Sequence, residues 1–329
     1  MTMPDPASMV AGVMAVALLV YALTGGADFG GGVWDLLASG PRAARQRTLA
    51  AKAIAPIWEV NHVWMILVVV LLFVCFPTAF AAISISLHVP LTLMLIGIVL
   101  RGTAFTFQHY GIQSDETGQR WRVLFAVSSV ATPVLLGIIV GACVSGRIRV
   151  DAPDFFASWM GVFPLAVGGF FLALCAYLAA VYLTVEAEEA ALKADFRTRA
   201  IGAGIAVGVM AALCLVLSGS GAPQLHEGLV GSPRALVGHT ATGLCALGAL
   251  GALWTRRYRL ARMLAVAQTV GIFAGWGFAQ APWLVVPDLT IAGAASPDNV
   301  LVSTLVILGG GSLLLVPALV WLMVLFKRG

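Results

Sequence analysis

Charged residues are scarce in this sequence. Only 10% of the 329 residues are Asp, Glu, Lys or Arg, whereas 60% are hydrophobic and the mean hydropathy is +0.97. A soluble domain of this size with so few charges would leave apolar surface in water, so a soluble fold is excluded. We therefore expect a polytopic protein of the lipid bilayer.

Dense basic tracts and paired cysteines are also lacking. The Lys and Arg residues are spread between apolar runs, so the net charge of +4 gives no reason to expect a nucleic-acid partner. The five cysteines all lie in apolar runs, and no two have Cys-x-x-Cys spacing. We expect free, buried thiols and no metal site.

Long apolar runs are what the sequence has in abundance. A run of roughly 20 apolar residues spans the hydrocarbon layer as a helix, and continuous runs without period-two alternation indicate helices rather than barrel strands. We predict an all-α transmembrane domain over 1–329 with nine helices, at about 8–37, 53–75, 79–107, 122–146, 160–185, 199–218, 234–254, 260–281 and 299–326.

The basic residues predict the orientation of these helices. With nine crossings, sixteen of the 19 Lys and Arg residues fall on one side, and only Arg147, Arg149 and Arg234 fall on the other. Basic residues accumulate in cytoplasmic connections. The N-terminus is therefore predicted outside and the C-terminus in the cytoplasm.

Polar residues at the start of the second run are the first candidates for function. Glu59, Asn61 and His62 open an apolar run, and Asp28 lies inside the preceding one. A charge near the bilayer centre costs roughly 2.5–3.5 kcal/mol, so such residues are seldom kept without a partner or a function. On a rise of about 1.5 Å per residue, Asp28 and Glu59 reach similar depths and could face each other as a proton relay. The alternative is that Asp28 caps a glycine-rich helix and Glu59 bonds Asn61, His62 or a neighbouring chain.

Arg101 and two histidines are further polar residues that lie within apolar runs. Arg101 is either a residue that extends to the membrane surface or the counter-charge of Glu59 or of a carboxylate in a partner chain. His62 and His88 lie well inside runs but are predicted at different heights, so we expect no haem ligands in this chain.

Several ordered motifs resemble one family. They are Gly-Ala-Asp-Phe-Gly at 26–30, Ile-Ala-Pro-Ile-Trp-Glu-Val-Asn-His-Val-Trp at 54–64, Phe-Pro at 76–77, Arg-Gly-Thr-Ala-Phe at 101–105 and Pro-Asp-Leu-Thr-Ile-Ala at 287–292. They are similar to subunit II of the cytochrome bd-type quinol oxidases, including the cyanide-insensitive branch. Trp58, Trp64, Pro77 and Asp288 are the structural residues of these motifs.

The resemblance implies a fold, a partner and a site. It implies two four-helix bundles plus one peripheral helix in the bacterial cytoplasmic (inner) membrane. It also implies a subunit without haem ligands that pairs with a larger subunit I, which holds haems b and d and the quinol site. A small accessory subunit and a structural quinone within subunit II are further possibilities. Glu59, Asp28 and Arg101, with Asn61 and His62 beside them, would form a proton pathway from the cytoplasm.

The sequence also departs from the family pattern. Thr106 and Gln108 stand where the family often has an acid and an arginine, and Gly25 stands where some members have an acid. Either Glu59 and Asp28 suffice with water, or the proton route has changed. A purely structural subunit and a proton-coupled secondary transporter remain the alternatives. An internal inverted repeat would favour the transporter, and none is evident.

Overall fold

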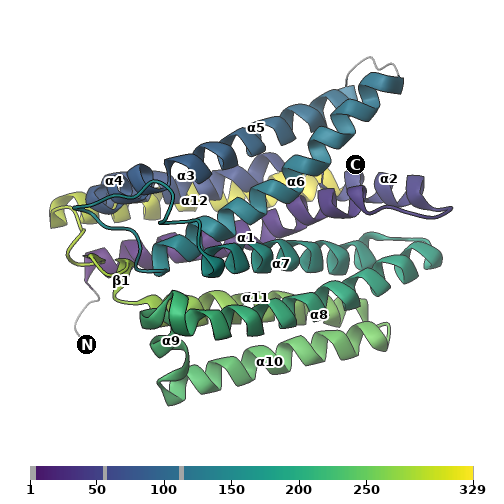
Figure 1. Cartoon of the computed structure of the whole chain (residues 1–329). Coiled ribbons are helices and arrows are strands. Elements are labelled where there is room, and N and C mark those ends of the chain that lie inside the picture. The colour runs from purple at the N-terminus through teal and green to yellow at the C-terminus, as the bar shows by residue number, and fades with distance from the viewer. Residues whose placement is uncertain (1–4, 55–57, 111–114, 329) are drawn as a thin grey trace.

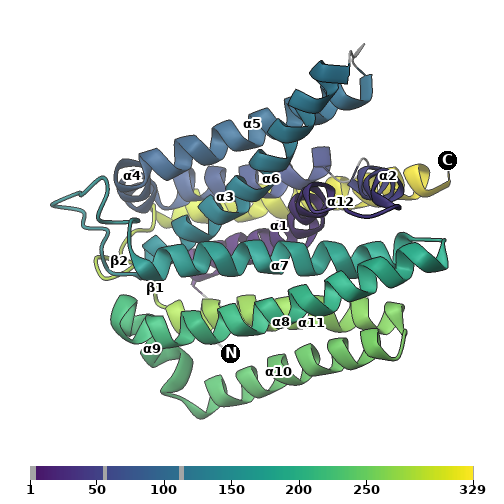
Figure 2. The same ribbon diagram turned by 45° about the vertical axis from the view of Figure 1, so that its right-hand side comes forward.

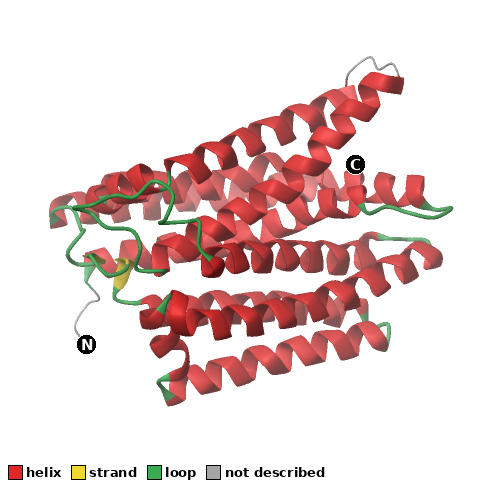
Figure 3. Ribbon diagram, viewed as in Figure 1, coloured by secondary structure: helices red, strands yellow, loops and turns green. Residues whose placement is uncertain are grey.

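The fold is a bundle of long helices. The computed structural model describes residues 5–54, 58–110 and 115–328, and at residues 54, 58–60, 109–110, 115–116, 316, 319–320 and 322–328 it describes the backbone only. The helices are α1 Pro6–Leu36, α2 Ala43–Ile54, α3 Trp58–Cys75, α4 Pro77–Ser86, α5 His88–Tyr110, α6 Asp115–Val144, α7 Val162–Glu186, α8 Ala190–Gly221, α9 Pro223–Val230, α10 Pro233–Trp254, α11 Tyr258–Gln280 and α12 Asp298–Arg328. Two short strands, β1 Trp283–Val285 and β2 Leu289–Thr290, pair antiparallel between α11 and α12 (Figure 3).

The predicted all-α membrane class is confirmed. Within the described ranges, eight helices are long and apolar enough to cross a membrane. A ninth candidate is the pair of Asn61–Cys75 and Pro77–Ser86, which is bent by 117° at its break. In Figure 1 the start of α1 and the end of α12 lie at opposite ends of the bundle.

The long helices form two bundles side by side. One contains α1, α3, α5 and α6, and the other contains α7, α8, α10 and α11 (Figures 1 and 2). Helix α7 joins the two because it packs against α1 and α6 as well as against α8. Helix α12 touches α1 and α3 and leaves most of its described side chains exposed, so it is the peripheral helix.

One predicted element needs correction. The run 79–107 is predicted as one helix, but it is interrupted at Leu87, so that α4 ends at Ser86 and α5 begins at His88. Pro77 starts α4 directly after Phe76, because a proline tolerates the first helical turn, where its missing N–H is not needed. The β1–β2 hairpin lies between the last two predicted helices.

The basic connections gather at one end of the molecule. Helix α2, the end of α5, the α7–α8 connection and the α10–α11 connection lie at the right-hand end in Figure 1. Together with the helix ends that adjoin them, they carry most of the Lys and Arg residues of the chain. We call this the basic end. The opposite end carries α4, α9 and the β hairpin.

Candidate functional site

The site is built on a buried ion pair between α1 and α5. Asp28 is fully buried and Arg101 is 2% exposed. Arg101 Nη2 lies 2.6 Å from Asp28 Oδ1, and Arg101 Nη1 donates to Asp28 Oδ2 at 2.8 Å. Nη2 also donates to the Asp28 carbonyl oxygen at 3.0 Å. Arg101 is therefore the counter-charge of Asp28, and a surface-directed Arg101 is ruled out.

A third helix completes the surroundings of Arg101. Its Nε donates to Ser129 Oγ of α6 at 3.0 Å. The guanidinium carbon lies 5.1 Å from the ring centroid of Phe29 and 5.0 Å from that of Phe125. Two parallel N–H···O bonds make the pair strong and directional, and aromatic faces attract a desolvated cation. One arginine thus fastens α1, α5 and α6 together.

Asn61 is held next to this pair by the residues before Asp28. Its side chain is buried, and Oδ1 accepts a hydrogen bond from Thr24 Oγ1 at 2.7 Å. Nδ2 has no partner among the described residues. A Cβ added at Gly25 would lie 2.8 Å from Asn61 Nδ2, so the amide fills the space that a side chain at position 25 would need. This packing is a physical reason for the glycine at that position.

His62 and Tyr21 extend the cluster along α3 and α1. Their ring centroids lie 6.2 Å apart, and the Tyr21 ring lies 6.3 Å from that of Phe29, which in turn contacts Arg101. The Tyr21 hydroxyl is buried and has no hydrogen-bond partner in the described part of the chain. The structure therefore brings Asn61, His62, Asp28 and Arg101 into one region.

Glu59 and Trp58 cannot be added to this description. Their side chains lie outside the described residues, although their backbone forms the first turn of α3. The predicted facing of Glu59 and Asp28 therefore stays a prediction. Among the described residues, the partner of the Asp28 carboxylate is a base, Arg101, and not a second acid.

The two other departures from the family pattern also have structural counterparts. Thr106 is exposed, and its hydroxyl donates to the Gly102 carbonyl oxygen of its own helix at 3.0 Å. Gln108 Nε2 is buried and has no partner among the described residues. Neither side chain brings a charge to the region.

The remaining motif residues have packing or loop roles. Trp64 packs against two buried clusters at α1, α3 and α7. Asp288 Oδ2 accepts from the Val150 N–H at 3.1 Å, and its Oδ1 lies 3.5 Å from Arg149 Nη1. Asp288 thereby ties the connection between α6 and α7 to the β hairpin.

The histidines lie in separate surroundings. His62 packs on Tyr21. His88 begins α5, its Nδ1 lies 3.0 Å from the Ile85 carbonyl oxygen, and its ring packs on Phe155. Within the described ranges, no three His, Cys, Asp or Glu side chains are grouped so that they could hold a metal ion.

Ser129 was missed at the sequence level. It lies in an apolar run together with Ser128 and Thr132, and all three are buried. Polar residues inside a membrane run normally hydrogen-bond across helices. That signal marked this face of α6, but only the structure shows that Arg101 is the partner.

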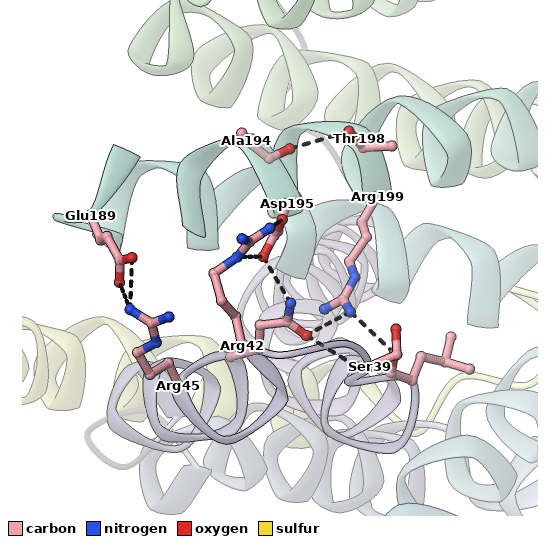
Figure 4. A network of polar contacts seen from close by, with 10 residues as sticks. Ser39, Arg42, Arg45, Glu189, Ala194, Asp195, Thr198 and Arg199 are labelled. Carbon is pink, nitrogen blue, oxygen red and sulfur yellow. Dashed lines mark hydrogen bonds and ion pairs between the residues drawn. The ribbon is translucent and has the colours of Figure 1, made fainter. Parts of the chain in front are cut away.

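A second polar cluster, the α2–α8 clamp, lies at the basic end. It consists of Arg42, Arg45, Gln46, Glu189, Asp195 and Arg199 (Figure 4). Asp195 accepts from Arg42 Nε at 2.8 Å, from Arg42 Nη2 at 2.6 Å and from Gln46 Nε2 at 2.8 Å. Arg199 Nη2 donates to Gln46 Oε1 at 2.8 Å. The clamp ties the α1–α2 connection to the start of α8, and so joins the two bundles.

Loss of the clamp should loosen α2. In Asp195→Asn, Arg42 loses its ion-pair partner, so trypsin should cleave the α2 region faster than in the wild type. Limited proteolysis followed by mass spectrometry measures this rate. Glu189→Gln is the matched control because its bond to Arg45, at 2.8 Å, is exposed, and exposed pairs contribute little. Equal cleavage rates in both variants would contradict the assignment.

The fold and the site together define a class of protein: a polytopic helical membrane protein with a buried, fully bonded ion pair in its interior. The chain belongs to the cytochrome bd terminal oxidase subunit II family, whose model matches residues 6–326. As a member of this family, the chain is a transmembrane component of a respiratory quinol oxidase complex that contains a subunit I. Family membership also implies that the chain lies in the inner membrane.

Individual relatives agree with this assignment. The putative cytochrome bd menaquinol oxidase subunit II of Bacillus subtilis (strain 168) is 22% identical over 289 residues, which are 83% of this chain and 82% of that protein. Subunit 2 of the cytochrome bd-I ubiquinol oxidase of Escherichia coli (strain K12) is 28% identical over 138 residues, 41% of this chain and 35% of that one. A chain in the structure of bd oxidase from Geobacillus thermodenitrificans has a TM-score of 0.82 at 21% identity and covers 98% of both chains, which confirms the fold.

Proposed function

We propose that this subunit scaffolds the haem-bearing subunit I and supplies a proton pathway that opens at the basic end. The observation that carries the proposal is the buried Asp28–Arg101 pair, with Asn61 and His62 beside it. A bonded charge pair inside a membrane protein is costly to bury. A proton pathway requires polar groups inside the membrane, which would explain why this pair is kept there.

The two acids have different parts in the proposed pathway. Both carboxylate oxygens of Asp28 accept from Arg101, so Asp28 sets the local field and holds Arg101 in place. Glu59 is the residue that accepts and releases protons. It lies two residues before Asn61, which is bonded to Thr24 of α1. With this anchoring, the first turn of α3 lies beside α1.

The remaining parts of the proposal come from the family. The haems b and d of subunit I would supply the chemistry of oxygen reduction, and quinol would supply the electrons. The chain acts as one transmembrane domain, with its N-terminus outside and its basic end in the cytoplasm. A structural quinone in this subunit and a small accessory subunit stay predictions of the resemblance.

Glu59→Gln tests the pathway. The complex should assemble with normal haem content, while quinol oxidase turnover falls on the order of 10²-fold, the contribution of a typical proton-transfer group. Oxygen consumption by the purified complex is the measurement. Glu227→Gln, at the opposite end of the bundle, is the control and should leave turnover unchanged. Near-normal turnover in Glu59→Gln combined with Asp28→Asn would refute the pathway.

A purely structural role is the second candidate, and one observation favours it. Both carboxylate oxygens of Asp28 already accept from Arg101, which is the arrangement expected of a pair that holds α1 to α5. In that case Glu59→Gln would lower neither turnover nor proton uptake. The transporter alternative predicts instead that the chain purifies colourless and alone, and an absorption spectrum with quantified subunits distinguishes it.

A further inference from the structure

A pocket at the basic end lies against the last turn of α1. It has a volume of about 410 Å³ and is lined by residues of α1, α2 and α6, among them Asp35, Arg47, Gln119, Arg122 and Ala126. Asp35 is only partly exposed, and its Oδ2 is buried without a hydrogen-bond partner among the described residues. The pocket therefore contains an acid that is free to bind and release a proton.

Two arginines flank Asp35 without pairing with it. Arg47 donates to main-chain carbonyl oxygens, with Nε 3.4 Å from that of Asp35 and Nη2 3.4 Å from that of Ala38. Arg122 of α6 lines the same pocket. Within the described ranges, no basic nitrogen lies within 4 Å of a carboxylate oxygen of Asp35. Asp28, in contrast, forms a bidentate pair with Arg101. Arg47 and Arg122 attract anionic groups and water to the pocket while leaving the carboxylate exchangeable.

The position of Asp35 in its helix is unfavourable for stability. It lies in the last turn of α1, which ends at Leu36. A negative charge at the C-terminus of a helix opposes the helix dipole and costs about 0.3–1 kcal/mol. A basic or neutral residue would be better there, so the acid indicates a use other than stabilising the helix.

The pocket leads towards the ion pair along one face of α6. Arg122, Ala126 and Ser129 follow one another at helical spacings of four and three, so they share a face. Ser129 accepts from Arg101, which binds Asp28. On α1, Asp35 and Asp28 are two turns apart, about 10 Å along the axis. The inner wall of the pocket is thus one turn from the buried pair.

We propose that Asp35 is the residue that takes up protons from the cytoplasm for the pathway of this subunit. This inference rests on the proposed function. The Asp35 carboxylate accepts a proton from water in the pocket and passes it inward to water near Ser129, which restores the carboxylate. No electron and no heavy atom moves in this step. Asp35 is the uptake group, and Glu59 lies further along the route.

The test is the pH dependence of turnover in the purified complex. In Asp35→Asn, turnover should fall about tenfold at about pH 8.5 and little at about pH 6, because capture limits the rate only when protons are scarce. Asp35→Glu should restore the wild-type profile. Formate, a small acid that fits the pocket, should restore turnover in Asp35→Asn but not in Glu59→Gln. Glu188→Gln removes an exposed charge at the same end and should follow the wild type.

The outcomes separate this inference from the proposed function. If Asp35→Asn follows Glu188→Gln at every pH while Glu59→Gln is slow, the uptake role of Asp35 is wrong and the pathway stands. A loss that is equal at all pH values and not relieved by formate or by Asp35→Glu shows a structural role and also overturns the inference. If Glu59→Gln turns over normally, the proposed function itself fails. Haem content of each variant confirms assembly.

Discussion

Replacing Arg101 with methionine should prevent this subunit from accumulating in the membrane. The substitution leaves the carboxylate of Asp28 fully buried and without its partner, and such a loss costs about 3–5 kcal/mol. It also removes the hydrogen bond to Ser129 and the contacts with Phe29 and Phe125. The amount of subunit in membranes and the thermal stability of the purified complex measure the effect.

A paired substitution distinguishes a lost charge partner from a lost side chain. Asp28→Leu combined with Arg101→Met removes both charges, so no unpaired ion remains, and replacing a buried pair by apolar residues is often tolerated. We expect the double variant to accumulate better than Arg101→Met alone. Equal loss in the single and the double variant would show that shape, and not charge, holds α1 to α5.

Gly30→Leu should separate α1 from α7 and is the second large effect. A Cβ at position 30 would collide with the carbonyl oxygen of Cys175 and would lie 2.6 Å from the Cβ of Ala179. The first neighbour is backbone and cannot turn aside, so the helices themselves must move. Overpacking costs about 1–3 kcal/mol where side chains can adjust, and we expect at least the upper value here. The unfolding temperature of the purified complex is the measurement.

Matched glycines on another helix provide the control. Gly202 and Gly208 of α8 have no heavy atom within 4 Å of an added Cβ. Alanine at either position should leave stability unchanged or raise it slightly, because alanine is the better helix former. If Gly30→Ala and Gly202→Ala behave alike, close approach of α1 and α7 is not what Gly30 provides.

Much of the site was predictable, but its pairing was not. Asp28, Asn61, His62 and Arg101 were singled out because polar residues are rare in apolar runs, and they lie together. The partner of Asp28 is Arg101, 73 positions away, which no spacing within one helix could show. Asp35 could not be recognised as a candidate in this way, because position in the sequence does not reveal a pocket between α1, α2 and α6.

Contacts between distant parts of the chain also explain why the prediction for the run 79–107 was wrong. The run 79–107 is apolar throughout, so hydropathy could not locate the interruption at Leu87. Leu87 separates α5 from α4, which is itself bent by 117° from the helix before it. Connections between spans are set by tertiary contacts, such as Ser158 Oγ donating to the Ser86 carbonyl oxygen at 3.1 Å.

The sequence by itself determined that the chain enters a membrane as helices, because hydrocarbon leaves unpaired backbone groups no partner outside the helix. It also determined which end is basic and which few polar residues are exceptional. Only the tertiary structure decided that Asp28 is bonded to Arg101 whereas Asp35 is left unpaired. The reason is that a carboxylate is held or free according to the side chains that neighbouring helices place within hydrogen-bond distance, and that placement arises from packing.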